Sequence, residues 1–499
     1  MYDLPRTGPA SLSVPAPNHL DITLFATPEV PIDRASIDEI VSFSRLQDTI
    51  EDLNPTGFFG DIRAGIERVV LTPDFHRGAG IPVGTVFLAN GFVVPKAVGN
   101  DIGCGMRLLT TDLRPDELAQ LDRRFDARLR HIFFEGGRDV ALNPLQRDGI
   151  LRHGIQALLD GPRPESATWA MLDRGHELSD LMRCHALGGF SSDDVHLFAD
   201  FIKGSAAAKT EFTRDDQTGS IGGGNHFVEI QQVAAVSDGA TARRWGLVPG
   251  TVTIMAHSGS VGLGHQVGTK FMDLARDLHP GGRRPEHGFH VLPTDGTHGA
   301  QGGAYLAAMR AAANFAFVNR LFLGLMVMRA MSETLGRRVH ARVVHDAPHN
   351  LIWSDERHRH LHRKGACPAL GTDDLDPEFP DGHPVIVPGS MGDSSWVLKG
   401  NGHQASFCSA CHGAGRISPR GTARKADPNE LSRIRVIGKI DPDAETFRRR
   451  PEIAAEWRKT MLEEAPSAYK PVTPIIDTVT KAGIADPVAE LRPILTVKG

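Results

Sequence analysis

The 499-residue sequence predicts an α+β protein, a single large unit in which mixed β-sheets are flanked by helices. The first observation behind this prediction is that strand-like and helix-like patterns occur in groups, without the regular alternation of a doubly wound parallel sheet. The second is that the sequence has neither an internal repeat nor a clear linker. The third is the composition: 40% hydrophobic and 23% charged residues are typical of globular proteins and exclude global disorder, collagen and coiled coil.

The N-terminal part predicts an arm followed by a helix. Residues 1–34 are rich in Pro, Ser and Asp without periodicity, which indicates an extended arm or a strand, and residues 35–46 have helical spacing. Over residues 69–106, short apolar runs alternate with Gly, Pro, Asn and Asp, which predicts strands and loops. We therefore divide the chain into an N-terminal arm and helix, residues 1–68, and a larger domain, residues 69–499.

The remaining elements follow from periodicity. Residues 115–132 and 194–203 have apolar residues at helical spacing, which predicts two surface helices, and HFVEIQQV and TVTIMAH predict strands. The longest predicted helix spans residues 303–335, where Ala, Leu, Met and Phe dominate and no proline intervenes. We expect it to be buried on most sides. It is too polar for a membrane span, because Asn314, Asn319 and Arg320 interrupt its most apolar stretch.

Charge and cysteine usage narrow the class of protein. With 55 Lys and Arg against 60 Asp and Glu, the net charge of -5 argues against coating nucleic acid through overall charge, although a local basic groove stays open. Five cysteines, an odd number in a long chain, argue against a disulfide framework. The N-terminus lacks the pattern of a signal peptide. We expect a cytoplasmic protein that does not engage a membrane.

Several acidic, thiol and imidazole side chains stand in glycine-rich loops at the ends of apolar runs, which favours a metal site. The candidates are Asp101, Cys104, His226, His257, His345 and His349. Asp-x-x-Cys places a carboxylate and a thiolate within one turn, which suits a borderline divalent ion or two ions that share the sulfur, and ligand softness alone favours zinc. Only one of His345 and His349 need be a ligand, because Pro348 favours a loop over a helix there. A single residue of this kind is more often an ordinary structural side chain than a ligand, and it is their joint occurrence in glycine-rich loops that favours a metal site.

Three further segments are ambiguous. SIGGGN (220–225) and GSVGLG (259–264) offer successive backbone amides to phosphate, but neither has P-loop or dinucleotide spacing, and glycine loops often only turn the chain. Cys408, Cys411 and His412 form Cys-x-x-Cys-His, the attachment pattern of haem c. That alternative requires export, for which the sequence shows no signal.

Taken together, the motifs from residue 69 to residue 499 resemble the RtcB family of RNA ligases. Ten segments occur in the family's order: PDFHRGAGIPVG, VGNDIGCGMRL, GGGNHFVEI, HSGSVGLGH, AANFAFVNR, HN (349–350), HRKGA, VPGSMGDSSWVL, CHGAGR and EAPSAYK. The resemblance implies an RtcB-like fold and a GTP- and Mn(II)-dependent ligase. Such an enzyme joins RNA 2',3'-cyclic phosphate or 3'-phosphate ends to 5'-hydroxyl ends, in RNA repair or tRNA splicing. It also accounts for the Cys-x-x-Cys-His segment without haem.

The resemblance also implies the site residues. His412 matches the histidine that is guanylylated by GTP before GMP passes to the RNA as RNA(3')pp(5')G. The positions that match the family's two Mn(II) ions, with the sulfur of Cys104 shared, are Asp101, Cys104, His226, His257 and His349. The positions that match its GMP contacts are Asn225, Glu229, Ser390, Ser395, Ala414, Gly415, Tyr469 and Lys498. The resemblance favours manganese over the zinc that softness suggests, and His349 over His345.

The sequence departs from the family at positions suited to RNA phosphates. Val261 stands where the family usually has arginine, Cys367 and Pro368 follow Ala366 in place of Thr-Arg, and Pro419 replaces a usual serine. The remaining cations near the motifs are Arg363, Lys364, Arg416, Arg420, Arg424 and Lys425. These departures predict a divergent ligase with altered RNA preference or efficiency. An RNA end-binding or sensing protein with little turnover and a metal-dependent cyclic phosphodiesterase are the alternatives, and an archease-type activator is a further expected partner.

Overall fold

Two large sheets stand side by side above one long helix in the computed structural model, which describes residues 4–159, 161–173, 175–203, 210–282, 284–374, 376–441, 444–445 and 449–499. Within these residues, the first sheet has the strand order β1 (Arg6–Gly8), β2 (Ser11–Ser13), β3 (Ile22–Phe25), β4 (Gly65–His76), β5 (Val83–Asn90), β15 (Arg359–Lys364) and β14 (Asn350–Ser354). Its strands pair antiparallel except β3 with β4.

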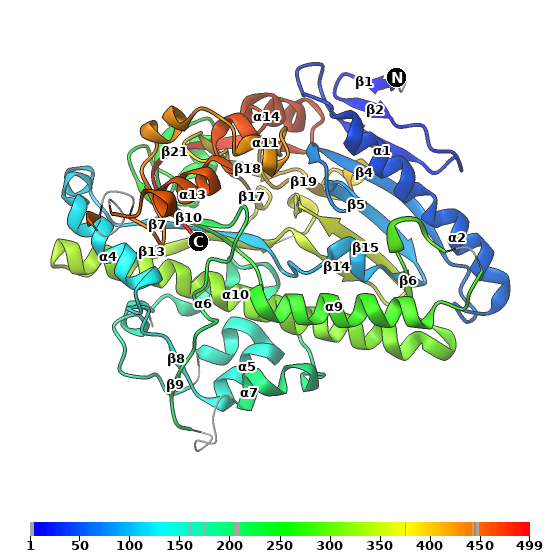
Figure 1. Ribbon diagram of the computed structural model, residues 1–499, viewed down its shortest axis with the longest axis horizontal. Coiled ribbons are helices and arrows are strands. Elements are labelled where there is room, and N and C mark those ends of the chain that lie inside the picture. The colour runs from blue at the N-terminus through cyan, green and yellow to red at the C-terminus, as the bar shows by residue number, and fades with distance from the viewer. Residues whose placement is uncertain are drawn as a thin grey trace.

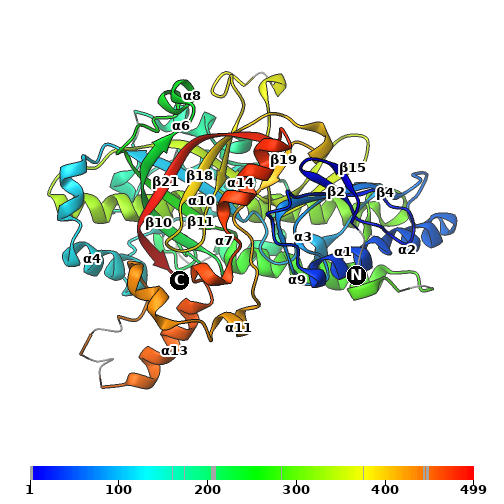
Figure 2. The ribbon, with the colours of Figure 1, turned by 90° about the horizontal axis from the view of Figure 1, so that it is seen from above.

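The second sheet carries most of the candidate residues. Its described order is β13 (Ala341–Pro348), β7 (Gly105–Thr111), β11 (Val252–Ser258), β10 (Phe227–Val236), β21 (Ala485–Lys498), β18 (Ser395–Gly400) and β17 (Pro384–Val387), with β20 (Val436–Ile437) beside β21. Short described pairs join β6 (Phe92–Val93) to β12 (Leu292–Pro293), β8 (Ala141–Leu142) to β9 (Thr213–Arg214), and β16 (Ala366–Pro368) to β19 (Ser409–Cys411). Figure 2 shows β21 beside β10 and β18.

The helices cover the sheets. They are α1 (Arg34–Ser44), α2 (Leu46–Leu53), α3 (Pro95–Val98), α4 (Arg123–Phe134), α5 (Pro144–His153), α6 (Glu177–Met182), α7 (Ala199–Lys203), α8 (Gly239–Arg244), α9 (Val261–Leu278), α10 (Gly299–Leu335), α11 (Arg420–Ala423), α13 (Pro451–Leu462) and α14 (Val472–Lys481). Figure 1 shows α10 crossing the molecule below both sheets, alongside α9. In Figure 2, α11 and α13 lie beyond the end of β21.

The predicted α+β class and the long helix are confirmed. Among the described residues, one helical stretch, Gly296–Leu335, is long and apolar enough to cross a membrane, and its most apolar window is completely buried inside the protein. The polar residues predicted to interrupt it are also buried, since Asn314, Asn319 and Arg320 are each 0% exposed. A helix with hydrogen-bonding groups on buried faces can hold several loops at once, and α10 does so beneath the candidate site.

Other predicted boundaries are refined by the structure. The helix predicted for residues 115–132 is broken into a 3₁₀ helix, Pro115–Gln120, and α4, because the Asp122 side chain accepts the Arg124 N–H at 2.9 Å and starts a new helix. Residues 194–203 likewise form a 3₁₀ turn followed by α7. The predicted division between residues 68 and 69 falls within β4, and β3 pairs directly with that strand. That division stays a prediction.

Candidate functional site

Neighbouring strands of the second sheet bring the five candidate metal ligands together at one end of the strands. Cys104 stands directly before β7, His226 directly before β10, and His349 directly after β13. His257 lies in β11 opposite Met106 of β7 and Phe227 of β10, so the antiparallel register sets these segments beside one another. The order β13-β7-β11-β10 therefore collects ligands that lie far apart in the sequence.

The ligand atoms converge on a shared sulfur. Cys104 Sγ lies 3.2 Å from His226 Nε2 and 3.2 Å from His257 Nε2. Beyond these contacts, His226 Nε2 lies 3.0 Å from Asp101 Oδ2, and His257 Nε2 lies 3.3 Å from His349 Nε2. The atoms form two overlapping groups, each within 4.8 Å: Asp101, Cys104 and His226, and Cys104, His257 and His349. Cys104 belongs to both, as a bridging ligand would.

The donor set fits one or two divalent cations. Burial lowers the pKa of His257 and His349 well below the usual histidine value, so these rings are neutral and offer lone pairs. Burial and then Asp101 raise the pKa of the Cys104 thiol well above its usual value, a balance that a bound cation reverses. The Nε2 atoms of His257 and His349, 3.3 Å apart and beside the sulfur of Cys104, offer a divalent cation the nitrogen and sulfur donors that such ions bind.

The structure separates the two histidine candidates at the end of β13. His345 Nδ1 donates to the carbonyl of Arg183 at 2.8 Å, away from the cluster, whereas His349 lies within it. A bulge between Val343 and His345 shifts the register of β13 against β7.

The glycines of the GSVGLG segment serve close packing. A Cβ on Gly259 would lie 2.3 Å from Asp101 Oδ1, and one on Gly264 would lie 2.1 Å from Ser260 Oγ. Only glycine leaves room for Asp101 against this loop. The contacts of these two glycines thus support the turn-and-packing interpretation of the segment.

His412 follows β19 and stands beside the cluster. Its Nδ1 lies 2.7 Å from Asp74 Oδ2, its backbone N–H donates to the same oxygen at 3.2 Å, and its ring centroid lies 4.7 Å from that of His349. Asp74 is 0% exposed and accepts a hydrogen bond from Thr72 Oγ1 at 2.5 Å. Burial alone would raise the pKa of Asp74, but the charge and hydrogen bond of His412 outweigh it and hold that pKa below its usual value.

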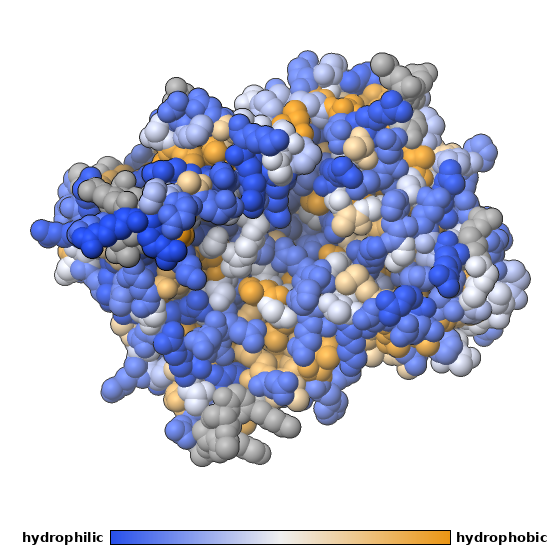
Figure 3. Space-filling model, viewed as in Figure 1, coloured by the Kyte–Doolittle hydropathy of each residue, from blue (hydrophilic) through white to orange (hydrophobic). Residues whose placement is uncertain are grey.

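A cavity of about 720 Å³ opens in front of His412 and His257. The face shown in Figure 3 is mostly hydrophilic and is hollowed near its middle. Of the predicted nucleotide contacts, those that line the cavity are Asn225, Glu229, Ser390, Ala414, Gly415, Tyr469 and Lys498. Ser395 lies behind its wall, where its hydroxyl accepts from Gln231 Nε2 at 2.8 Å and from the Gly389 N–H at 3.2 Å. A volume of this size fits a nucleotide-sized ligand.

Charged groups on the cavity wall are largely satisfied within the protein. Glu229 accepts from Thr496 Oγ1 and Gln231 Nε2, both at 2.6 Å, and burial raises its pKa to about 7. Lys498 Nζ donates to the carbonyl of His226 at 2.9 Å, and burial lowers its pKa to about 8. Ser390 Oγ is buried and has no partner among the described residues, so it is available to a ligand in the cavity.

Sequence reasoning missed two residues of this site. Asp74 stands in PDFHRG, but its role depends on a contact with a residue 338 positions away. Glu464 lines the cavity, pairs with Arg416 at 3.2 Å and lies 3.9 Å from Lys498, and it accepts the hydroxyl of Tyr469. Each residue has one indication in the sequence: Asp74 lies in the family motif PDFHRGAGIPVG, and Glu464 lies in EAPSAYK.

The cations predicted to bind RNA do not all line the cavity, and neither do the residues that depart from the family pattern. Arg416 and Arg420 line the cavity, whereas Arg363 is 4% exposed and donates to Ser409 Oγ at 2.8 Å, so it supports the fold. Cys367 and Pro368 are buried in β16 against β19, and Val261 begins α9 with a left-handed backbone, φ +49°. The segment that bears Cys367 therefore faces the core in this protein.

A cluster of metal-ligating side chains beside a ligand-sized cavity is the arrangement of a metal-dependent enzyme. Residues 61–499 match the family model described as tRNA-splicing ligase RtcB. The tRNA-splicing ligase RtcB of Thermococcus kodakarensis is 32% identical over 86% of this chain and 87% of its own, and the RNA-splicing ligase RtcB of Mycobacterium tuberculosis is 34% identical over 86% and 96%. The chain belongs to the RtcB family and is an enzyme of the RNA ligase class.

Proposed function

We propose that the protein is a GTP- and Mn(II)-dependent ligase that joins RNA 2',3'-cyclic phosphate or 3'-phosphate ends to 5'-hydroxyl ends, in RNA repair or tRNA splicing. The observation that carries this proposal is the pairing of His412 with buried Asp74, at the point where the candidate metal cluster meets the cavity. The relatives are named tRNA-splicing and RNA-splicing ligases, which supports an RNA substrate of splicing for this protein. The cytoplasmic location and an archease-type activator stay predictions.

Asp74 orients His412 as a nucleophile. An ionised carboxylate 2.7 Å from Nδ1 holds the ring proton there, which leaves the lone pair on Nε2. Nε2 attacks the α-phosphorus of GTP; the N–P bond forms, the bond to the β-phosphate bridging oxygen breaks, and pyrophosphate leaves. GMP then passes to the RNA 3'-phosphate, and the 5'-hydroxyl displaces GMP. A cyclic phosphate is first opened by hydrolysis at the same site.

The residues that would hold two Mn(II) ions are Asp101, Cys104, His226, His257 and His349, with the sulfur of Cys104 shared. When bound, such ions neutralise phosphate oxygens and stabilise in-line displacement at phosphorus. His257 and His349 are fixed by their strands on the side of the cluster that faces His412, since the His349 ring lies 4.7 Å from it. The same residues can therefore hold the ions near both the nucleophile and the cavity.

The cavity residues would select and bind guanine nucleotide. Glu229 can accept from the N1 and N2 donors of guanine, which adenine does not offer, and Ser390 Oγ is a free hydroxyl for a ligand oxygen. The other predicted contacts are Asn225, Ala414, Gly415, Tyr469 and Lys498 on the wall and Ser395 behind it. Behind the wall, Ser395 would act by fixing the Gly389 backbone and Gln231.

The test is labelling of the purified protein with GTP that carries ³²P at the α-phosphate, in the presence of Mn(II). We expect acid-labile label on the unaltered protein and none on His412→Ala. Asp74→Asn, which loses the negative partner of Nδ1, should label on the order of 10²–10⁴-fold more slowly. His345→Gln is the matched control, because His345 lies outside the cluster, and it should label normally.

The alternatives are distinguished by products. Absence of label, with metal shown to be bound, would contradict the guanylylation mechanism. Conversion of a cyclic phosphate to 3'-phosphate without GTP and without a joined strand would then identify a cyclic phosphodiesterase. Binding of such RNA ends without any product would identify an end-binding protein.

A further inference from the structure

Two consecutive polar residues of α10, Asn319 and Arg320, are 0% exposed beneath the candidate metal cluster. A buried guanidinium is costly unless its charge is paired and its donors are used. The carboxylate of Asp346, itself 0% exposed, supplies the charge partner: Arg320 Nε donates to Asp346 Oδ1 at 2.8 Å. The remaining hydrogen bonds of Asn319 and Arg320 end on the segments that carry the cluster, and Arg320 Nη2 has no hydrogen-bond partner among the described residues.

Arg320 joins three of those segments. Its Nη1 donates to the carbonyl of Gly103 at 2.7 Å and to the carbonyl of Ser258 at 3.0 Å. Gly103 directly precedes Cys104, Ser258 directly follows His257, and Asp346 stands three residues before His349 in the same chain segment. One planar group thus fixes the relative positions of the chain segments that bear Cys104, His257 and His349.

Asn319 reaches the fourth segment. Its Oδ1 accepts the N–H groups of Gly219 at 2.8 Å and Ser220 at 2.9 Å, in the loop that leads to His226. Its Nδ2 donates to the carbonyls of Ser220 at 2.9 Å and Gly259 at 3.1 Å. The loop of His226 is thereby tied to the loop that follows His257.

We infer that Arg320 is a positioning residue of the metal centre, whose guanidinium sets the spacing of Cys104, His257 and His349, with Asn319 extending the same support to His226. This inference rests on the proposed metal centre. The reason is geometric: the planar fork of arginine can donate to a carboxylate and to two carbonyls in fixed directions, which a lysine ammonium cannot reproduce. Loss of the Arg320 guanidinium should leave the strands paired but let the segments that bear Cys104, His257 and His349 move apart. Metal binding should weaken as a result.

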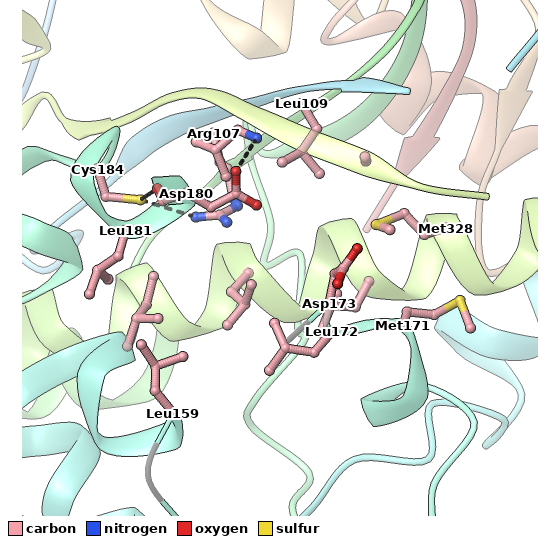
Figure 4. Close-up of a pocket in the computed structure, with 15 residues that line it drawn as sticks. Arg107, Leu109, Leu159, Met171, Leu172, Asp173, Asp180, Leu181, Cys184 and Met328 are labelled. Carbon is pink, nitrogen blue, oxygen red and sulfur yellow. Dashed lines mark hydrogen bonds between the residues drawn. The ribbon is translucent and has the colours of Figure 1, made fainter. Parts of the chain in front are cut away.

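Asp346 has a second arginine partner, Arg107, which provides a matched control for Arg320. Arg107 of β7 donates from Nη1 to the other oxygen of Asp346 at 3.0 Å. Its second contact is the sulfur of Cys184 at 3.6 Å, at one end of a small, largely apolar pocket of about 50 Å³ (Figure 4). Neither contact touches the backbone of a ligand loop. Removing Arg107 or Arg320 therefore deletes one buried guanidinium and leaves Asp346 with one partner in either case.

The experiment is anaerobic titration of the full-length protein with Co(II), which binds thiolate and imidazole sites more tightly than Mn(II) and reports a bound thiolate through its charge-transfer band. Arg320→Met should weaken Co(II) binding by about 10–100-fold and reduce or shift that band. Arg107→Met should bind Co(II) within about threefold of the unaltered protein, with the same band, because it removes only one of the two partners of the Asp346 carboxylate and no hydrogen bond to the backbone next to a ligand. Arg320→Lys keeps the charge without the fork and should resemble Arg320→Met.

Each outcome decides the inference. Unchanged affinity and band in Arg320→Lys or Arg320→Met, or an equal loss in Arg107→Met, would overturn it while leaving the metal centre intact. Should Arg320→Met fail to fold, Arg320→Lys carries the same comparison. Absence of a thiolate band in the unaltered protein would remove the proposed metal centre itself, and this inference with it.

Discussion

The metal cluster and the outer wall of the cavity use the same kinds of charged residue but hold them in opposite ways. Behind the cluster, Arg320 and Asp346 are both 0% exposed, and their hydrogen bonds end on ligand-bearing backbone. We call the outer wall the exposed ends of α11 and α13, next to Arg420 and Glu464 of the cavity; there, Arg424 is 44% exposed and pairs with Glu463 at 2.5 Å. Exposed pairs are screened by water and salt, whereas buried pairs keep one geometry. The difference indicates that folding fixes the spacing of the candidate metal ligands more firmly than it fixes the exposed side chains beside the cavity.

The largest expected effect is on stability, from Asp346→Ala. This change leaves two buried guanidinium groups, Arg107 and Arg320, without a carboxylate, and should lower the free energy of unfolding by about 3–5 kcal/mol. The contrasting variant on the outer wall is Arg424→Ala, which should lower it by about 1 kcal/mol or less. Urea titrations of both variants measure the difference. Equal losses would show that the two regions are held alike.

The sequence predicted the residue types of the candidate site better than the contacts between residues that lie far apart in the chain. Cysteine, aspartate and histidine beside glycine-rich segments were enough to predict a metal site, and the structure brings these residues together because the segments meet at the ends of strands that are adjacent in the sheet. Their role as ligands stays a prediction. The residues alone left His345 and His349 open, since the bulge in β13 that separates them depends on pairing with β7. Asp74 and Glu464 escaped assignment because each acts through partners that only the tertiary structure supplies.

The fold shows the same division. The long helix over residues 303–335 was predicted because its composition is locally decisive, and it is present as α10. Its buried Asn319 and Arg320 were interpreted only as polar interruptions, since their partners come from four segments that lie far from them in the sequence. The break at Asp122 was missed although an N-cap aspartate is a local signal, because apolar spacing continues across it.

A smaller effect is expected from Glu229, a buried charge on the inner wall of the cavity. Burial raises its pKa from 4.5 to about 7, so between these pH values the folded protein binds more protons than the unfolded chain. The stability that this group contributes is complete below pH 4.5 and is lost as pH rises through about 7, an effect of about 3 kcal/mol. Glu229→Gln should remove this dependence.

The measurement is the free energy of unfolding from pH 5 to pH 8 for the unaltered protein and for Glu229→Gln. As pH rises, the free energy of unfolding of the unaltered protein should fall relative to that of Glu229→Gln. Parallel curves would show that folding does not raise the pKa of Glu229.

The smallest effect concerns Val261, which stands at the start of α9. Its φ of +49° is a left-handed conformation that a β-branched residue adopts at a cost. Val261→Gly should relieve this and raise the free energy of unfolding by about 0.5–1 kcal/mol, measured by urea titration. Val261→Arg keeps the strain but restores the guanidinium usual in the family, so it should leave stability unchanged and increase ligation of a cleaved tRNA. Ligation unaffected by Val261→Arg would show that the missing arginine does not limit RNA joining in this member.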